Sequence, residues 1–120
     1  MRIKLTILFS LIFPLSFISP GMAADPGNAH EAGRSAAFDK NRGNCLACHA
    51  IPNDPTAISP GNIGPPLIGM KARYPDRAKL RAQIWDATAV NPRTAMPPFG
   101  KNKILTEPEI DQVTDYIYGI

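Results

Sequence analysis

The chain has 120 residues, with 13 basic side chains, 10 acidic side chains and a net charge of +3 at neutral pH. This length suffices for one domain. Two of the basic residues, Arg2 and Lys4, belong to an apolar N-terminal segment, so residues 24–120 are nearly neutral, which argues against a nucleic-acid partner.

The N-terminal segment has the layout of a secretory signal. Arg2 and Lys4 precede an uncharged run over residues 5–18, and small, helix-breaking residues follow up to Ala23. We predict a signal peptide over residues 1–23, cleaved after Ala23 or one residue later, and one domain over residues 24–120. The run is shorter than the roughly 18–20 apolar residues of a membrane span and contains Pro14, so a permanent membrane anchor is the weaker alternative.

Residues 28–40 are rich in alanine and contain no proline, which predicts a first helix with a face of small residues. Gly33 lies inside this helix and suits a position where another backbone approaches closely. Residues 52–66 carry five prolines and two glycines, which predicts a long loop. A loop of this length in a compact domain is usually wrapped around something.

Residues 76–89 predict a second helix. Asp76 is a plausible cap, and the apolar stripe consists of Leu80, Ile84 and Ala87. The Asn91-Pro92 pair ends this segment.

A capping box at residues 106–109, Thr-Glu-Pro-Glu, predicts the start of the last helix. Apolar residues then recur at helical spacing, at Ile110, Val113, Ile117 and Ile120. No segment alternates like a strand for more than a few residues. The sequence therefore predicts an all-α domain with long loops.

The two cysteines of the chain lie in one short stretch, GNCLACHA at residues 43–50. On a helical turn, Cys45, Cys48 and His49 leave the same face. Two thiols on one face can add to the two vinyl groups of a haem, and the adjacent imidazole then lies under the iron. The C-x-x-C-H motif is thus the attachment site of a c-type haem. We predict one covalently attached haem c, with His49 as an iron ligand. The haem would also provide the extra stabilisation that so short a domain needs.

Three alternatives compete for these residues. A Cys₂His₂ zinc site needs a second histidine downstream, but the other histidine, His30, lies upstream. A thioredoxin-like dithiol needs a preceding strand and a βαβ context, for which the sequence gives no signal. A disulfide between Cys45 and Cys48 would close a very short loop and stabilise little.

The candidates for the sixth iron ligand are Met96, Met70, His30 and the lysines. Met96 is favoured because Pro97 and Pro98 restrict the backbone on its C-terminal side, and a thioether is a soft ligand for haem iron. Met70 looks more like a packing residue, and His30 like a surface residue of the first helix. With His49 and Met96 as ligands, the iron would transfer single electrons.

Charges are segregated along the chain. The basic cluster is Lys71, Arg73, Arg77, Lys79 and Arg81, and the acidic cluster is Glu107, Glu109, Asp111 and Asp115. We favour two solvated helix faces over a docking surface as their explanation.

The sequence resembles the class I cytochromes c. In that family a G-P-x-L-x-G segment follows the haem motif, and residues 64–69, Gly-Pro-Pro-Leu-Ile-Gly, match it. The resemblance implies a fold of three to four helices around one haem. It also implies that the Pro65 carbonyl accepts a hydrogen bond from His49, that Leu67 packs on the haem plane, and that the first and last helices cross at Gly33.

A narrower resemblance covers residues 34–120. The segments FDKNRGNCLACH, GNIGPPLIGMKARYP, LRAQIWDATAVNPRTAMPPFG and ILTEPEIDQVTDYI are similar to those of the SoxX family. This family supplies the small monohaem subunit of SoxAX complexes, in which Met96 would match the axial methionine. The resemblance implies a periplasmic location and a heterodimer with a larger, SoxA-like haem subunit.

The same resemblance implies a function. SoxAX is an L-cysteine S-thiosulfotransferase that oxidatively links thiosulfate to a cysteine of the carrier protein SoxY. The small subunit would accept electrons from the partner haem and pass them to a downstream cytochrome c. Both cysteines of this chain would be thioethers, so no catalytic residue is expected here. The alternatives are a freely diffusing monohaem cytochrome and a ligand-sensing haem protein with an open iron position.

Overall fold

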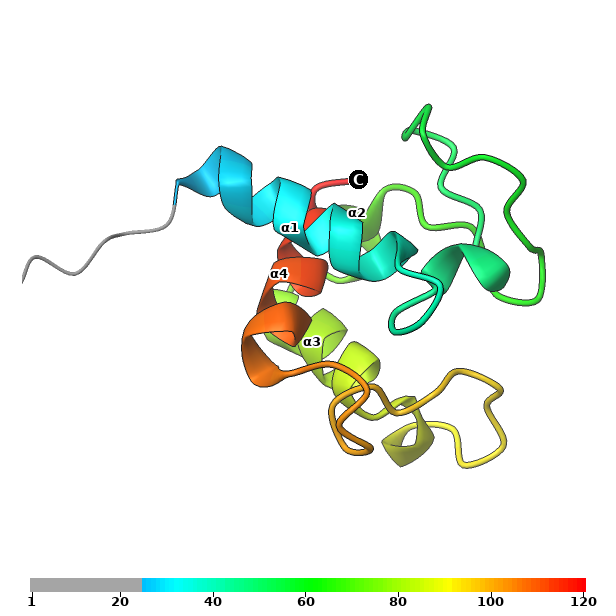
Figure 1. Cartoon of the computed structure of the whole chain (residues 1–120). Coiled ribbons are helices and arrows are strands. Elements are labelled where there is room, and N and C mark those ends of the chain that lie inside the picture. The colour runs from blue at the N-terminus through cyan, green and yellow to red at the C-terminus, as the bar shows by residue number, and fades with distance from the viewer. Residues whose placement is uncertain (1–24) are drawn as a thin grey trace, which may run out of the picture.

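Residues 25–120 are described by a computed structural model, and the predicted signal segment lies outside them. Four α-helices are joined by long loops (Figure 1). Their bounds are α1 Pro26–Phe38, α2 Met70–Arg73, α3 Arg77–Trp85 and α4 Glu107–Tyr118, and two 3₁₀ turns are η1 Cys45–Ala47 and η2 Ala87–Ala89. No strand occurs between residues 25 and 120, so the all-α prediction is confirmed for this part. None of the helices described is long and apolar enough to cross a membrane.

The first and last helices cross in close contact (Figure 1). On α1, Ala36 and Ala37 are buried, and on α4 the buried residues include Val113 and Tyr116. At Gly33 an added Cβ atom would collide with the backbone carbonyl of Gln112. The small face of α1 therefore lets the two backbones approach, as predicted.

Helix α4 begins at the predicted capping box. The Thr106 hydroxyl oxygen accepts a hydrogen bond from the amide of Glu109 at 3.4 Å, and the Glu109 carboxylate accepts one from the amide of Thr106 at 2.9 Å. Two amides that the helix itself leaves without partners are thereby satisfied. Behind this cap, Ile110, Val113 and Ile117 face the core.

Helix α3 is shorter than predicted. Asp76 caps its start by accepting from the amide of Ala78 at 2.9 Å, as expected. At Asp86 the backbone leaves the helical region (φ −151°, ψ 86°), and the carboxylate accepts from the amide of Thr88 at 3.0 Å. The aspartate thus starts the separate turn η2, which corrects the single helix expected over residues 76–89.

Helix α1 lies two residues earlier than predicted, and helix α2 is an element that the prediction lacks. Asp25 accepts from the amide of Gly27 at 3.1 Å, so α1 begins at Pro26 and ends two residues before Lys40. Helix α2 was not predicted at all. It is a single turn whose first amide, on Met70, donates to the carbonyl of Ile120 at 2.9 Å, a contact that depends on the folded chain.

The loop over residues 52–66 is irregular, as predicted, and lies along the segment that carries the two cysteines. The amide of Gly61 donates to the carbonyl of Leu46 at 2.7 Å, and the amide of Gly64 donates to that of Cys48 at 2.8 Å. The loop is also tied to α4, because the Tyr116 hydroxyl donates to Asp54 at 2.7 Å. These bonds fix a segment that has no regular structure of its own.

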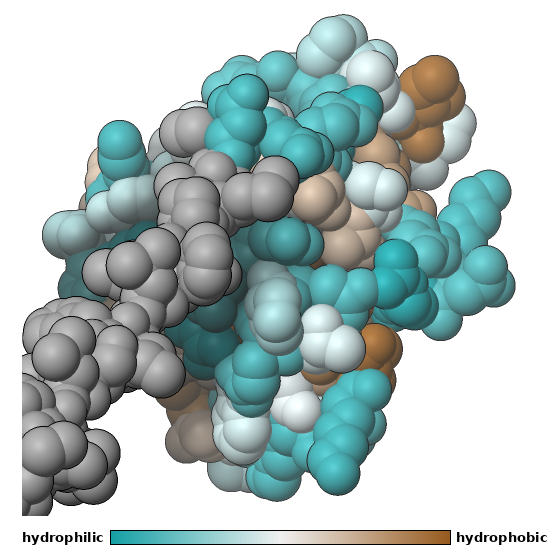
Figure 2. All heavy atoms as spheres, turned by 60° about the vertical axis from the view of Figure 1, so that its left-hand side comes forward, coloured by the Kyte–Doolittle hydropathy of each residue, from teal (hydrophilic) through white to brown (hydrophobic). Residues whose placement is uncertain are grey.

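Arginines of the basic cluster pair with the acidic cluster between α3 and α4. Arg77 binds Asp115 at 2.6 Å, and Arg81 binds both Asp111 and Glu107 at 2.6 Å. The hydrogen bonds to Asp111 and Glu107 raise the pKa of Arg81, and Arg81 lowers the pKa of both carboxyl groups. The paired side chains remain 29–62% exposed, so both clusters are solvated, as expected, and they face each other between α3 and α4. The face in Figure 2 is largely hydrophilic, with hydrophobic residues in scattered places.

The Gly33 contact predicts a difference between two alanine substitutions in α1. Gly33→Ala forces the crossing helices apart and should lower the free energy of unfolding by about 1–3 kcal/mol. Gly27→Ala is the control, because its added Cβ atom would meet only Asp25 Oδ1 at 3.6 Å, an ordinary contact. Alanine there should be neutral or stabilising by up to about 1 kcal/mol. Urea unfolding followed by circular dichroism measures both; equal stability of the two variants would contradict the close crossing.

Candidate cofactor site

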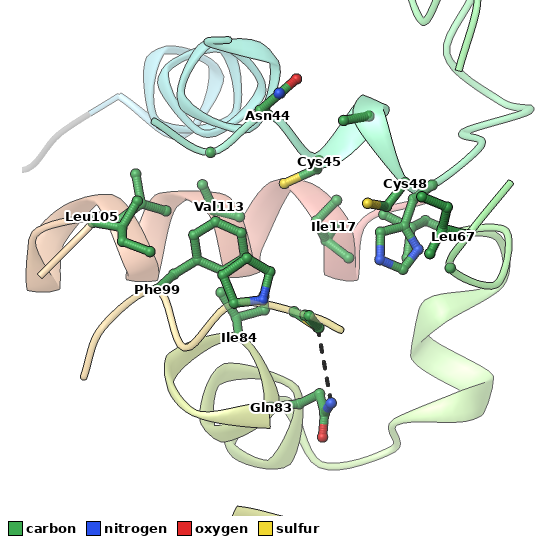
Figure 3. A pocket seen from close by; sticks show the side chains of 18 of the residues that line it. Asn44, Cys45, Cys48, Leu67, Gln83, Ile84, Phe99, Leu105, Val113 and Ile117 are labelled. Atoms are coloured by element: carbon green, nitrogen blue, oxygen red, sulfur yellow. Dashed lines mark hydrogen bonds between the residues drawn. The ribbon is translucent and has the colours of Figure 1, made fainter. Parts of the chain in front are cut away.

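A cavity of about 520 Å³ lies between η1, the loop at residues 63–67, α3, the segment at residues 94–99 and α4. Its volume is in the range of about 300–1,000 Å³ that is usual for cofactor sites. Most of its wall is apolar (Figure 3). The buried apolar residues that line it are Leu67, Met70, Leu80, Ile84, Phe99, Leu105, Val113 and Ile117.

Both cysteines lie at one wall of this cavity, on and just after η1 (Figure 3). Asn44 has a left-handed backbone (φ 46°) and starts the turn, and the amide of His49 donates to the carbonyl of Cys45 at 2.9 Å. Cys45, Cys48 and His49 therefore line the same space, as the helical-turn prediction requires. No disulfide joins Cys45 to Cys48, and burial raises the pKa of Cys45 to about 11, which reflects its apolar surroundings.

The imidazole of His49 is held by its own loop contacts. Its Nδ1 lies 2.7 Å from the carbonyl oxygen of Pro65, and because that oxygen can only accept, Nδ1–H donates. The predicted hydrogen bond is present. Gly64 passes so close that a Cβ atom there would overlap the imidazole ring. The bond to Pro65 orients the ring and leaves Nε2 available as a ligand.

Met96 lies on the irregular segment before α4 and also lines the cavity. Its amide donates to the Thr94 hydroxyl oxygen at 3.2 Å. Its sulfur contacts Gln83 of α3, which lies across the cavity from Cys45 and Cys48 (Figure 3). The structure thus brings His49 and Met96 to one cavity from different walls.

The other ligand candidates lie differently. Met70 lines the cavity but is 2% exposed within the core, and its sulfur accepts from Arg73 at 3.4 Å. These contacts agree with a packing role. His30 packs edge-on against Tyr116, with ring centroids 5.1 Å apart, outside the cavity lining.

Sequence reasoning left two site residues without a role. Gly64 was matched only as part of the G-P-x-L-x-G segment, and its contact with the imidazole depends on how the loop folds back. Gln83 lies on the stripe of α3 that also carries Leu80 and Ile84. The signal was its polar side chain at an inward-facing position.

The residues present fit a haem c. The cavity is apolar, two cysteine sulfurs lie at one wall, and it is lined by an imidazole, a borderline iron donor, and by a thioether, a soft one. By contrast, within residues 25–120 no three His, Cys, Asp or Glu side chains converge to hold a metal ion. A tetrahedral zinc site would require such a cluster.

Comparisons with known proteins agree with this chemistry. Residues 28–117 match the family described as cytochrome c oxidase, cbb3-type, subunit III. Over 77 residues, 64% of its length, the chain is 35% identical to an uncharacterized lipoprotein of Aquifex aeolicus (strain VF5). It spans only 36% of the length of that relative.

Among solved structures, the chain resembles the crystal structure of SoxXA from P. pantotrophus. The TM-score is 0.66 and the identity is 29%, over 73% of this chain and 78% of the other. The family match covers more than half of the chain. The chain therefore belongs to the cytochrome c family described as cytochrome c oxidase, cbb3-type, subunit III, and it is a SoxX-like cytochrome.

Proposed function

We propose that this chain carries one haem c, tethered through Cys45 and Cys48, with His49 and Met96 as its iron ligands. The observation that carries the proposal is that all four side chains line one apolar cavity. When bound there, a haem c supplies one-electron redox chemistry at its iron. The chain is thus an electron-transfer cytochrome subunit, and His49 and Met96 would both hold the iron from within this chain.

The residues around the cavity have separate tasks. The carbonyl of Pro65 holds the His49 ring at Nδ1, which leaves Nε2 free to bind the iron. As an iron ligand, the Met96 thioether would favour the reduced state. Leu67, Ile84 and Phe99 keep the surroundings apolar and exclude water, which raises the reduction potential further.

Covalent attachment predicts a mass difference. The exported protein should have the mass of the processed chain plus one haem, and this mass should persist after denaturation. The double variant C45A/C48A should lose the haem on denaturation, since both thioether bonds are removed. Mass spectrometry under denaturing conditions measures this. A wild-type chain of polypeptide mass alone, with free thiols or a disulfide, would contradict the proposal.

The ligand assignment predicts different effects for two methionine substitutions. Met96→Leu should abolish the sulfur-to-iron charge-transfer band of the oxidised protein and lower the midpoint potential. Met70→Leu is the matched control. It conserves volume at a buried position, costs less than about 1.5 kcal/mol of stability, and should leave band and potential in place. Absorption spectroscopy and redox titration measure both; loss of the band in Met70→Leu alone would reassign the ligand.

The likeness to SoxXA supports a place in a complex of that kind. We propose that the partner is a larger, SoxA-like haem chain in the periplasm, after export and cleavage of residues 1–23. The reaction that links thiosulfate to a cysteine of a SoxY-type carrier protein would take place at that partner chain. The argument for this division is that the sequence contains two cysteines, both assigned to the haem, and no third thiol. This chain would relay the released electrons to a downstream cytochrome c.

A complex predicts co-elution. Purified from its own host at physiological salt, the native protein should elute with a second haem-bearing chain at a fixed stoichiometry. Size-exclusion chromatography with haem staining of the separated chains provides the measurement. Elution of this chain alone, with its spectrum intact, would instead identify a freely diffusing carrier.

A further inference from the structure

Gln83 lies where the pattern of α3 calls for an apolar residue. Leu80, Gln83 and Ile84 are spaced i, i+3 and i+4, so they share one face of the helix. Leu80 and Ile84 are 3% and 5% exposed, and all three line the cavity. A polar side chain among core residues costs stability unless it has a partner. Gln83 itself is only partly buried, and the side-chain contact that its amide makes lies inside the cavity.

The amide of Gln83 points to the sulfur of Met96. Its Nε2 lies 4.0 Å from the sulfur, and Figure 3 marks this contact with a dashed line. A thioether sulfur can accept a hydrogen bond but cannot donate one, so the N–H end of the amide faces it. On the other side, Thr94 accepts from the Met96 amide at 3.2 Å. The residue is thus held at its backbone by one side chain and at its sulfur by another.

We propose that Gln83 is a positioning residue that fixes the Met96 sulfur and raises the reduction potential of the site. This inference rests on the proposed function of Met96 as an iron ligand. The positive end of an N–H dipole draws electron density from the sulfur and disfavours additional positive charge nearby. Both effects act against the oxidised state, which carries one more positive charge. The hydrogen bond therefore favours the reduced state.

A purely structural role for Gln83 makes the opposite prediction. If the side chain only filled space, leucine would fill it equally well and would make the site drier. Burying a charge in drier surroundings costs more, so the oxidised state would be disfavoured and the potential would rise. The sign of the change on Gln83→Leu thus separates a hydrogen bond to the sulfur from packing.

The test compares Gln83→Leu, Gln83→Asn and Gln112→Leu in the full haem-loaded protein. Leucine removes the donor, and asparagine keeps the polarity but withdraws the donor by one methylene group. Gln112 is a half-buried glutamine of α4 outside the cavity lining, so its replacement controls for the loss of an amide elsewhere. Thermal unfolding of each variant shows whether it is folded.

Both Gln83 variants should lower the preference for the reduced state about threefold, which is about 28 mV at 59 mV per tenfold for one electron. The sulfur-to-iron charge-transfer band should shift or weaken in both, and added imidazole should displace Met96 at lower concentration. Gln112→Leu should change none of these. If the wild type shows the band and the Gln83 variants match its potential, or Gln83→Leu raises it, the inference is overturned. Absence of the band in the wild type would overturn the ligation by Met96 itself.

Discussion

The crossing of α1 and α4 is the contact on which the rest of the structure depends. Without a side chain at Gly33, the backbone of α1 rests against the carbonyl of Gln112. This contact fixes two walls of the cavity at once. The chain leaves α1 at Phe38 and reaches Cys45 within one short loop, while α4 supplies Val113 and Ile117 to the cavity from the neighbouring turns. A shift of one helix against the other would move the cysteines relative to the apolar wall opposite them.

The candidate site combines parts that are positioned in different ways. Cys45, Cys48 and His49 come from one turn, so their relation is local. Met96 lies on a segment without helical hydrogen bonds. Its amide donates to Thr94, its sulfur contacts Gln83, and two prolines follow it in the chain. Irregular loops carry both candidate ligands, and the helices provide the rigid frame behind them. The charged pairs between α3 and α4 hold that frame together on its outer side.

Much of this arrangement could be predicted from the sequence because its signals are local. The capping box at Thr106, the cap at Asp76 and the cysteine spacing each involve residues within one turn. Two of the failures involve long-range contacts. Helix α2 depends on a bond from Met70 to Ile120, and the pairing of Arg81 with Asp111 requires α3 and α4 to lie side by side. The early end of α3 at Asp86 is a competition between continuing a helix and capping a new turn, which helix propensity alone does not resolve.

The anchoring of the two candidate ligands has a consequence for the speed of electron transfer. The His49 ring is hydrogen-bonded to the Pro65 carbonyl, and the Met96 amide is hydrogen-bonded to Thr94, so the ring and the Met96 backbone would be held in place when the charge on a bound iron changes. Groups that are already in place need little rearrangement at the moment of reaction. In a relay of the kind proposed, this keeps the reorganisation energy small. Electrons could then hop between centres under a small driving force, with the hopping rate set largely by the distance between the centres.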